Sequence, residues 1–140
     1  MIFLQTLKNS RFSFFCIFGA IGFVIDGVIC NYIYLNFNTM PHFARIISIF
    51  FSMNFSWIAN RTFTFKINYF KSFKEWFSYL SMLSVGVLIN YFVFIFSLFI
   101  LGESQINIWI SLAAGSLSGL VFNYNSAKFL FSFLQKKSSR

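Results

Sequence analysis

Long apolar runs, interrupted only briefly by polar residues, make up most of the chain and predict its helices. A membrane-spanning helix needs about 20 apolar residues to cross a hydrocarbon core of roughly 30 Å. Four runs meet that need, at residues 12–35, 43–60, 76–101 and 107–127. The pattern therefore predicts an all-α membrane protein with four transmembrane helices, forming a single transmembrane domain over residues 1–140.

A short pattern in the first run recurs in the third run. Gly22 precedes Asp26 by one helical turn, and Gly86 precedes Asn90 in the same way. Each half of the chain holds two predicted spans, so both halves begin on the same side of the membrane. We therefore expect two parallel-repeat helix pairs, related by an axis along the membrane normal.

The positions of the basic residues predict the orientation in the membrane. All of the eleven except Arg45 lie before the first run, between the second and third runs, or after the fourth. Cytoplasmic loops carry an excess of Lys and Arg, so we expect both termini in the cytoplasm and Arg45 on the other side. The segment 61–75 is then a basic interfacial connection, and 128–140 is a basic C-terminal tail.

The net charge of +8 is explained by this topology and needs no nucleic acid, because the basic residues form no continuous stripe. Residues that support catalysis are also sparse. The only histidine, His42, lies in a predicted outer loop, and two membrane-embedded cysteines do not make a metal site. No glycine-rich phosphate loop or serine-base arrangement is present. We therefore expect no enzyme, no metal and no cofactor.

Asp26 lies deep in the first apolar run, where a carboxylate is costly and is functional by default. Three roles are open for it. It can pair with a basic or amide side chain to fix helix packing, titrate as part of proton coupling, or hydrogen-bond a polar substrate within the bundle. Gly19 and Gly22 share its helix face, so we expect a shallow groove of small residues around it.

Small residues recur at every fourth position on the second and fourth predicted helices. The two stripes are Ala44, Ser48, Ser52, Ser56 and Asn60, and Ser111, Gly115, Gly119, Asn123 and Ala127. Membrane helices approach one another closely along such faces. Helix packing explains most of these residues, and one stripe is a candidate contact for a possible homodimer.

The second and fourth predicted helices end in similar motifs. Asn60 and Arg61 precede an aromatic pair, and Asn123 and Lys128 precede another. A cation at this depth can neutralise a lipid phosphate while the amides accept and donate hydrogen bonds to hydroxyl groups. A positive-inside stop with aromatic anchors explains the same residues equally well from physics alone.

These residues resemble the GtrA-like family of small membrane proteins, over about residues 8–134. The features are Arg11-Phe12 opening the first span, the glycines before Asp26, Asn60-Arg61-x-Phe63-Thr64-Phe65 closing the second span, and the stretch from Asn123-Tyr124 to Lys128-x-x-Phe131 closing the fourth.

The resemblance implies translocation of a polyprenyl-phosphate-linked sugar across the bacterial cytoplasmic membrane, for glycosylation of a cell-envelope polysaccharide. A membrane glycosyltransferase is then an expected partner, besides the lipid bilayer itself. The corresponding hypothesis gives the phosphate to Arg11, Arg61 and Lys128, the sugar to Asn60, Asn90 and Asn123, and a sugar hydroxyl or a transient cation to Asp26.

Two other functions are open on the sequence. A small proton-coupled multidrug-type exporter of cationic compounds also has four short helices and one membrane carboxylate. Alternatively, the chain is a non-transporting partner that positions a membrane glycosyltransferase through its basic and aromatic inner face.

Overall fold

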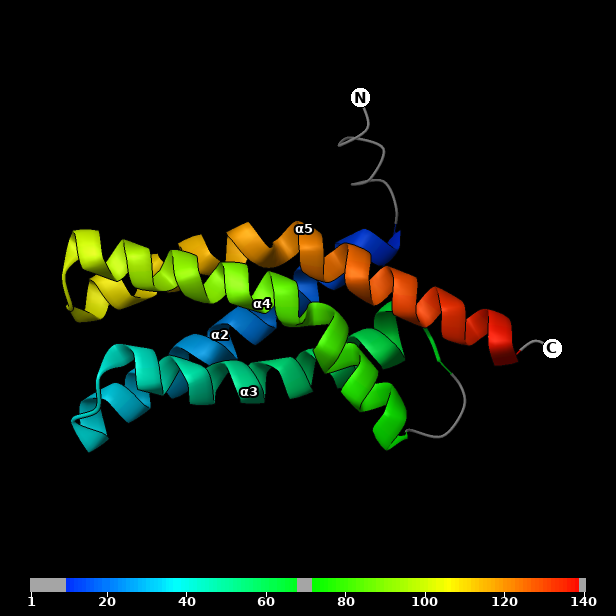
Figure 1. Cartoon of the computed structure of the whole chain (residues 1–140), viewed down its shortest axis with the longest axis horizontal. Helices are drawn as coiled ribbons and strands as arrows, with labels where there is room; N and C mark the ends of the chain where they lie inside the picture. The colour runs from blue at the N-terminus through cyan, green and yellow to red at the C-terminus, as the bar shows by residue number, and fades with distance from the viewer. Residues whose placement is uncertain (1–9, 68–71, 139–140) are drawn as a thin grey trace, which may run out of the picture.

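The computed structural model describes residues 10–67 and 72–138, and this part of the chain is helical without strands (Figure 1). Its elements are α2 (Ser10–Phe37), α3 (Pro41–Ala59), the π-helical turn η1 (Asn60–Thr64), α4 (Phe73–Leu101) and α5 (Gln105–Ser138). The predicted all-α fold is confirmed for the described residues. The four predicted spans fall within α2, α3 with η1, α4 and α5, respectively.

Three of the described helices, α2, α4 and α5, are long and apolar enough to cross a membrane. The chain is therefore a multi-pass membrane protein. The second predicted span is not among them, because His42, Arg45, Asn54 and three serines lower the mean hydropathy of the 19-residue helix α3. Arg45 and Ser48 are fully buried against the other helices, so the polar face of α3 is turned into the bundle.

The helices form two hairpins, α2 with α3 and α4 with α5, which lie against each other (Figure 1). Short connections join the helices of each hairpin at one end of the bundle, here called the loop end. Asn38 ends α2 with a φ of 49°, and Gly102 ends α4 with a φ of 81°, a conformation that glycine adopts without strain. The opposite end, where α2 begins and α5 finishes, is called the terminal end.

The small-residue stripe of α5 packs against α4 within the chain. A Cβ atom on Gly119 would lie 2.5 Å from the carbonyl oxygen of Gly86, and one on Gly115 would lie 2.6 Å from the carbonyl oxygen of Asn90. Only glycine permits so close an approach of the two backbones.

The stripe of α3 packs in the same way against α2. Ser52 donates a hydrogen bond of 2.9 Å to the carbonyl oxygen of Gly22, and a Cβ on Gly22 would lie 3.1 Å from the hydroxyl of Ser56. Both stripes thus serve contacts inside the chain. The expectation that one of them forms a homodimer contact has to be corrected, and a homodimer would need another surface.

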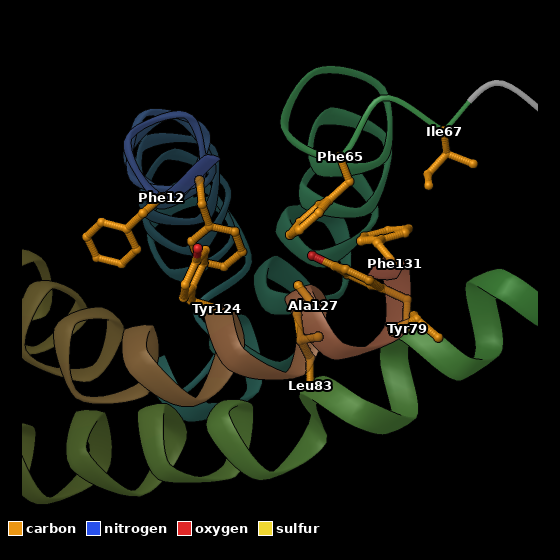
Figure 2. Close-up of a cluster of buried hydrophobic side chains, with 10 residues drawn as sticks. Phe12, Phe65, Ile67, Tyr79, Leu83, Tyr124, Ala127 and Phe131 are labelled. Atoms are coloured by element: carbon orange, nitrogen blue, oxygen red, sulfur yellow. The ribbon is translucent and has the colours of Figure 1, made fainter. Parts of the chain in front are cut away.

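Two clusters of buried apolar side chains hold the hairpins together. The cluster at the terminal end contains Phe12, Phe15, Phe65, Ile67, Tyr79, Leu83, Tyr124, Ala127, Leu130 and Phe131 (Figure 2). The cluster at the loop end contains Cys30, Ala44, Phe94, Leu98, Ile108 and Leu112.

The terminal-end cluster explains why α5 is longer than the span predicted for it. Leu130 and Phe131 are buried in that cluster, so the helix continues through most of the predicted tail at 128–140 and ends at Ser138. In the predicted connection at 61–75, η1 and the start of α4 occupy the two ends. Residues 68–71, which include Tyr69 and Phe70, lie outside the described residues.

Candidate functional site

A cavity of about 530 Å³ lies between the two hairpins. All four helices contribute to its wall, which is mostly apolar. Its polar lining residues are Asp26, Ser52, Ser56, Asn60, Tyr79, Asn90, Ser116 and Asn123. Asp26 and Phe15 mark the extent of the lining along α2, eleven residues apart, which corresponds to about 16 Å of helix. The cavity therefore covers about half the thickness of a hydrocarbon core of roughly 30 Å.

The cavity reaches the lipid-facing surface between α2 and α5. Among its lining residues, Ala20 of α2 and Leu117 of α5 are exposed, and Leu117 keeps 71% of its surface. The lining residues of α3 and α4 are buried or half-buried. A ligand in the cavity could thus contact the surrounding lipid at the α2–α5 side.

Four of the seven candidate residues line this one cavity. Asp26 and Asn90 lie toward the loop end, while Asn60 and Asn123 lie toward the terminal end. The Oδ1 atom of Asn123 is buried and has no hydrogen-bond partner among the described residues. It packs against Gly86 of α4, in the contact between α4 and α5.

The other three candidates, the basic residues, do not line the cavity. Arg11 and Lys128 are exposed toward the terminal end, on α2 and α5. The Lys128 ammonium lies 6.0 Å from the ring centroid of Tyr124, and the ring of Phe12, next to Arg11, packs edge-on against that same ring at 4.8 Å. The two cations therefore flank one aromatic cluster.

The third basic candidate, Arg61, is buried and turned toward Glu75. Its Nε donates to Glu75 Oε1 at 2.7 Å, and Trp57 Nε1 donates to the same oxygen at 3.2 Å. Arg61 Nη1 also donates to the carbonyl oxygen of Ile67 at 3.2 Å. These contacts direct the Arg61 side chain into an ion pair at the terminal end. The hypothesis from the sequence had assigned this side chain to the lipid phosphate.

Glu75 is a residue that sequence reasoning missed, although a signal was present. Its backbone N–H donates to the Ser72 hydroxyl at 3.1 Å, which makes Ser72 the N-cap of α4. Ser-x-x-Glu before an apolar run is a recognised helix start. The pattern gives the place where α4 begins but does not show that the carboxylate pairs with Arg61.

The π-helical turn η1 gives Asn60 and Arg61 different environments. Asn60 Nδ2 donates to the hydroxyl of Tyr79 at 3.4 Å, and Thr64 Oγ1 donates to Asn60 Oδ1 at 2.9 Å. Asn60 is thereby held on the cavity wall while Arg61 contacts Glu75. Such turns are rare and often occur at functional sites.

Asp26 belongs to a buried polar network that joins three helices. Arg45 of α3 donates one hydrogen bond to Asp26 of α2 and another, of 2.6 Å, to Asn90 Oδ1 of α4. Ser48 donates to the second carboxylate oxygen of Asp26 at 2.5 Å. The Arg45 guanidinium also lies 5.1 Å from the ring centroid of Phe94. Of the three roles open for Asp26, the ion pair is the one with a visible partner.

Arg45 is the second residue that sequence reasoning missed. Its position near an outer loop predicted a cation on the outer side, but its side chain is fully buried between the helices. The available signal was its place three residues before Ser48, close to the small-residue stripe of α3. A buried pair of this kind is expensive to break, because the remaining partner becomes an uncompensated charge.

The family described as GtrA/DPMS, transmembrane domain, matches residues 14–132. That range contains every residue lining the cavity and both buried ion pairs. No curated protein and no solved structure matches the chain.

Proposed function

Because the chain belongs to the GtrA/DPMS transmembrane-domain family, we propose that it translocates a polyprenyl-phosphate-linked sugar across the bacterial cytoplasmic membrane. The translocated sugar lipid then serves as the sugar donor for glycosylation of a cell-envelope polysaccharide. The observation that carries the proposal is the cavity between the hairpins, which has a carboxylate or amide group from each of α2, η1, α4 and α5 on a mostly apolar wall.

The properties of the cavity suit a sugar attached to a lipid. Small-molecule pockets measure roughly 300–1,000 Å³, and this one has about 530 Å³. Moving polar hydroxyl groups through hydrocarbon without hydrogen-bond partners costs several kcal/mol each. Asp26, Asn60, Asn90 and Asn123 offer such partners, and the opening at Ala20 and Leu117 lets the polyprenyl chain stay in lipid.

The cations at the terminal end support the direction of transport. We assign that end to the cytoplasm, with Arg11 and Lys128 meeting the phosphate there. Arg61, held by Glu75, has a positioning role in this proposal because it fixes the turn that presents Asn60. In this arrangement α3 crosses the membrane as a fourth span, and each hairpin is one of two parallel repeats.

The state of Asp26 favours an anionic cargo over a cationic one. An exporter of lipophilic cations requires an acid that is free to face its cargo. Asp26 is instead paired with Arg45 in a network without excess negative charge. The exporter function therefore has less support than transport of a phosphate-linked sugar.

The test measures transfer of the sugar lipid in vesicles that contain the purified protein. A glycosidase added outside reports how much sugar has reached the outer leaflet. We expect the natural chain to transfer the sugar lipid. The Asn123→Leu variant should transfer it at least tenfold more slowly, because the cavity loses a hydrogen-bonding group. Asn125→Leu is the matched control, since Asn125 is exposed two residues away on the same helix.

Absence of transfer by the natural chain would refute the translocase and leave the non-transporting partner of a glycosyltransferase. Equal rates for Asn123→Leu and Asn125→Leu would show that the cavity is not the path.

A further inference from the structure

We propose that Arg45 is a phosphate-binding residue at the loop end of the cavity, and that Asp26 is its exchangeable counterion. When the lipid phosphate arrives, it takes the place of the Asp26 carboxylate on the guanidinium, and the ion pair forms again when the phosphate leaves. This role rests on the proposed function, and it assigns a phosphate-binding cation to the end of the cavity that lies away from Arg11 and Lys128.

Arg45 lies beside the loop end of the cavity. Its guanidinium donates hydrogen bonds to the side chains of Asp26 and Asn90, and both of these line the cavity toward the loop end. The guanidinium is therefore one hydrogen bond away from the cavity. Because Asp26 and Asn90 belong to different hairpins, an anion at this point would contact both halves of the bundle.

Arg45 lies apart from the other cations among the described residues. The described Lys and Arg residues other than Arg45 lie toward the terminal end, on the first turn of α2, in or beside η1, at the start of α4, or in the last third of α5. An anion that leaves these cations enters a mostly apolar cavity, where an uncompensated charge is very costly. Among the described residues, Arg45 is the only Lys or Arg that can compensate it toward the loop end.

The network has enough hydrogen-bonding capacity for Arg45 to exchange one anion for another. A guanidinium has five N–H donors in a planar fork that fits phosphate oxygens in pairs. The Nε of Arg45 is buried and has no hydrogen-bond partner among the described residues, so donor capacity remains unused. After displacement, the Asp26 carboxylate keeps the hydroxyl of Ser48 as a donor. Exchange thus leaves neither partner without hydrogen bonds.

A purely structural ion pair and an exchangeable one predict opposite effects of removing the carboxylate. The experiment measures binding of farnesyl phosphate to the purified chain in detergent. The readout is the rise in melting temperature as the ligand concentration increases. If Asp26 competes with the phosphate, Asp26→Asn binds about tenfold tighter than the natural chain, since a charge competing at a buried site is removed. If the pair is only structural, Asp26→Asn binds no tighter, and the proposal fails.

The double variant Asp26→Asn/Arg45→Gln keeps the proposal falsifiable if the single variant does not fold. It removes both charges and so leaves no uncompensated charge in the bundle. We expect it to lose at least tenfold in affinity for farnesyl phosphate. Lys74→Gln is the matched control, because it removes one exposed cation from α4 and should bind as the natural chain does. Unchanged binding by the double variant would overturn the proposal.

Two further ligands identify the source of the phosphate. Farnesol, which lacks the phosphate, should bind equally to the natural chain and the double variant. Inorganic phosphate should bind far more weakly than farnesyl phosphate, and equal affinities would overturn assignment to a lipid phosphate. Arg45-dependent binding without sugar-lipid transfer would refute the proposed function alone, whereas transfer with Arg45-independent binding would refute this inference alone.

Discussion

Two of the three acidic residues in the chain are buried in ion pairs, one toward each end of the bundle. Asp26 pairs with Arg45 toward the loop end, and Glu75 pairs with Arg61 toward the terminal end. Neither pair is within one helix. Each one therefore fixes how two segments meet, in a medium where a single charge without a partner is costly.

Loss of the Glu75 carboxylate should destabilise the chain more than loss of an exposed one. Glu75→Gln leaves the buried Arg61 without its counterion, which costs about 3–5 kcal/mol. Glu103→Gln, at an exposed position in the connection after α4, should change stability by less than about 0.5 kcal/mol. Unfolding of the purified variants in a denaturing detergent compares the two. Similar stabilities would mean that the Arg61–Glu75 pair contributes little.

Two hydroxyl groups orient the side chain of Asn60, and the shorter hydrogen bond comes from Thr64. Thr64→Val keeps the side-chain shape but removes the donor to Asn60 Oδ1, so we expect a loss of about 1 kcal/mol in stability. It should also slow sugar-lipid transfer, because Asn60 then keeps only the longer hydrogen bond to Tyr79 and is held less firmly on the cavity wall. Thr62→Val, at an exposed position in the same turn, is the control in both assays. Transfer by Thr64→Val at the rate of the control would contradict this role.

At the scale of helices, the approach of α4 and α5 rests on glycines. Gly119→Ala would place a Cβ 2.5 Å from the carbonyl oxygen of Gly86, so the helices must separate. We expect a cost of about 1–3 kcal/mol, typical of overpacking. Gly19→Ala is the matched control, since nothing lies within 4 Å of its added Cβ. Thermal unfolding of both variants provides the comparison, and equal melting temperatures would contradict the close contact.

The last turns of α5 contribute through the terminal-end cluster. Phe131 is fully buried beside Phe65 and Tyr79 (Figure 2), whereas Phe133 on the same helix is 61% exposed. Phe131→Ala should therefore cost about 3–5 kcal/mol. Phe133→Ala exchanges an exposed ring for a methyl group and should cost far less. Their unfolding midpoints measure the difference, which should vanish if the end of α5 does not pack in solution.

The sequence contained most of the helical architecture because run length and apolarity decide which segments enter a membrane. All four predicted spans fall inside helices, and the glycine positions correctly indicated a close helix contact. The weaker apolarity of α3 was less visible, because Arg45 and its serines were assigned to topology and packing. Their burial follows from contacts with α2 and α4 that run lengths do not encode.

The candidate site was predictable in part for the same reason. Intramembrane amides and acids stand out against apolar runs, so Asp26, Asn60, Asn90 and Asn123 could be selected from the sequence. The buried ion pairs could not be predicted from the sequence. Asp26 and Arg45 lie 19 residues apart, and Arg61 and Glu75 lie 14 residues apart, in both cases on different segments. Such pairs depend on helix rotation, which tertiary packing decides.

At the scale of the whole molecule, the proposed arrangement has a definite sidedness. In a chain whose own cysteines are replaced, single cysteines at Lys66 and Ser132 should react with a membrane-impermeant reagent only from the cytoplasmic side. A cysteine at Asn38 or Glu103 should react only from outside, because these positions follow α2 and α4 at the loop end. If cysteines at positions 38 and 66 react from the same side, α3 does not cross the membrane.

The exposed position of Ala20 and Leu117 beside the cavity bears on which carriers the protein can accept. Because the cavity opens laterally toward the acyl chains of the bilayer, the hydrocarbon tail of a lipid carrier does not have to pass through the helix bundle. Recognition would then depend on the headgroup, and the number of isoprene units would have little influence on turnover. Carriers differing only in tail length would be served by the same small protein.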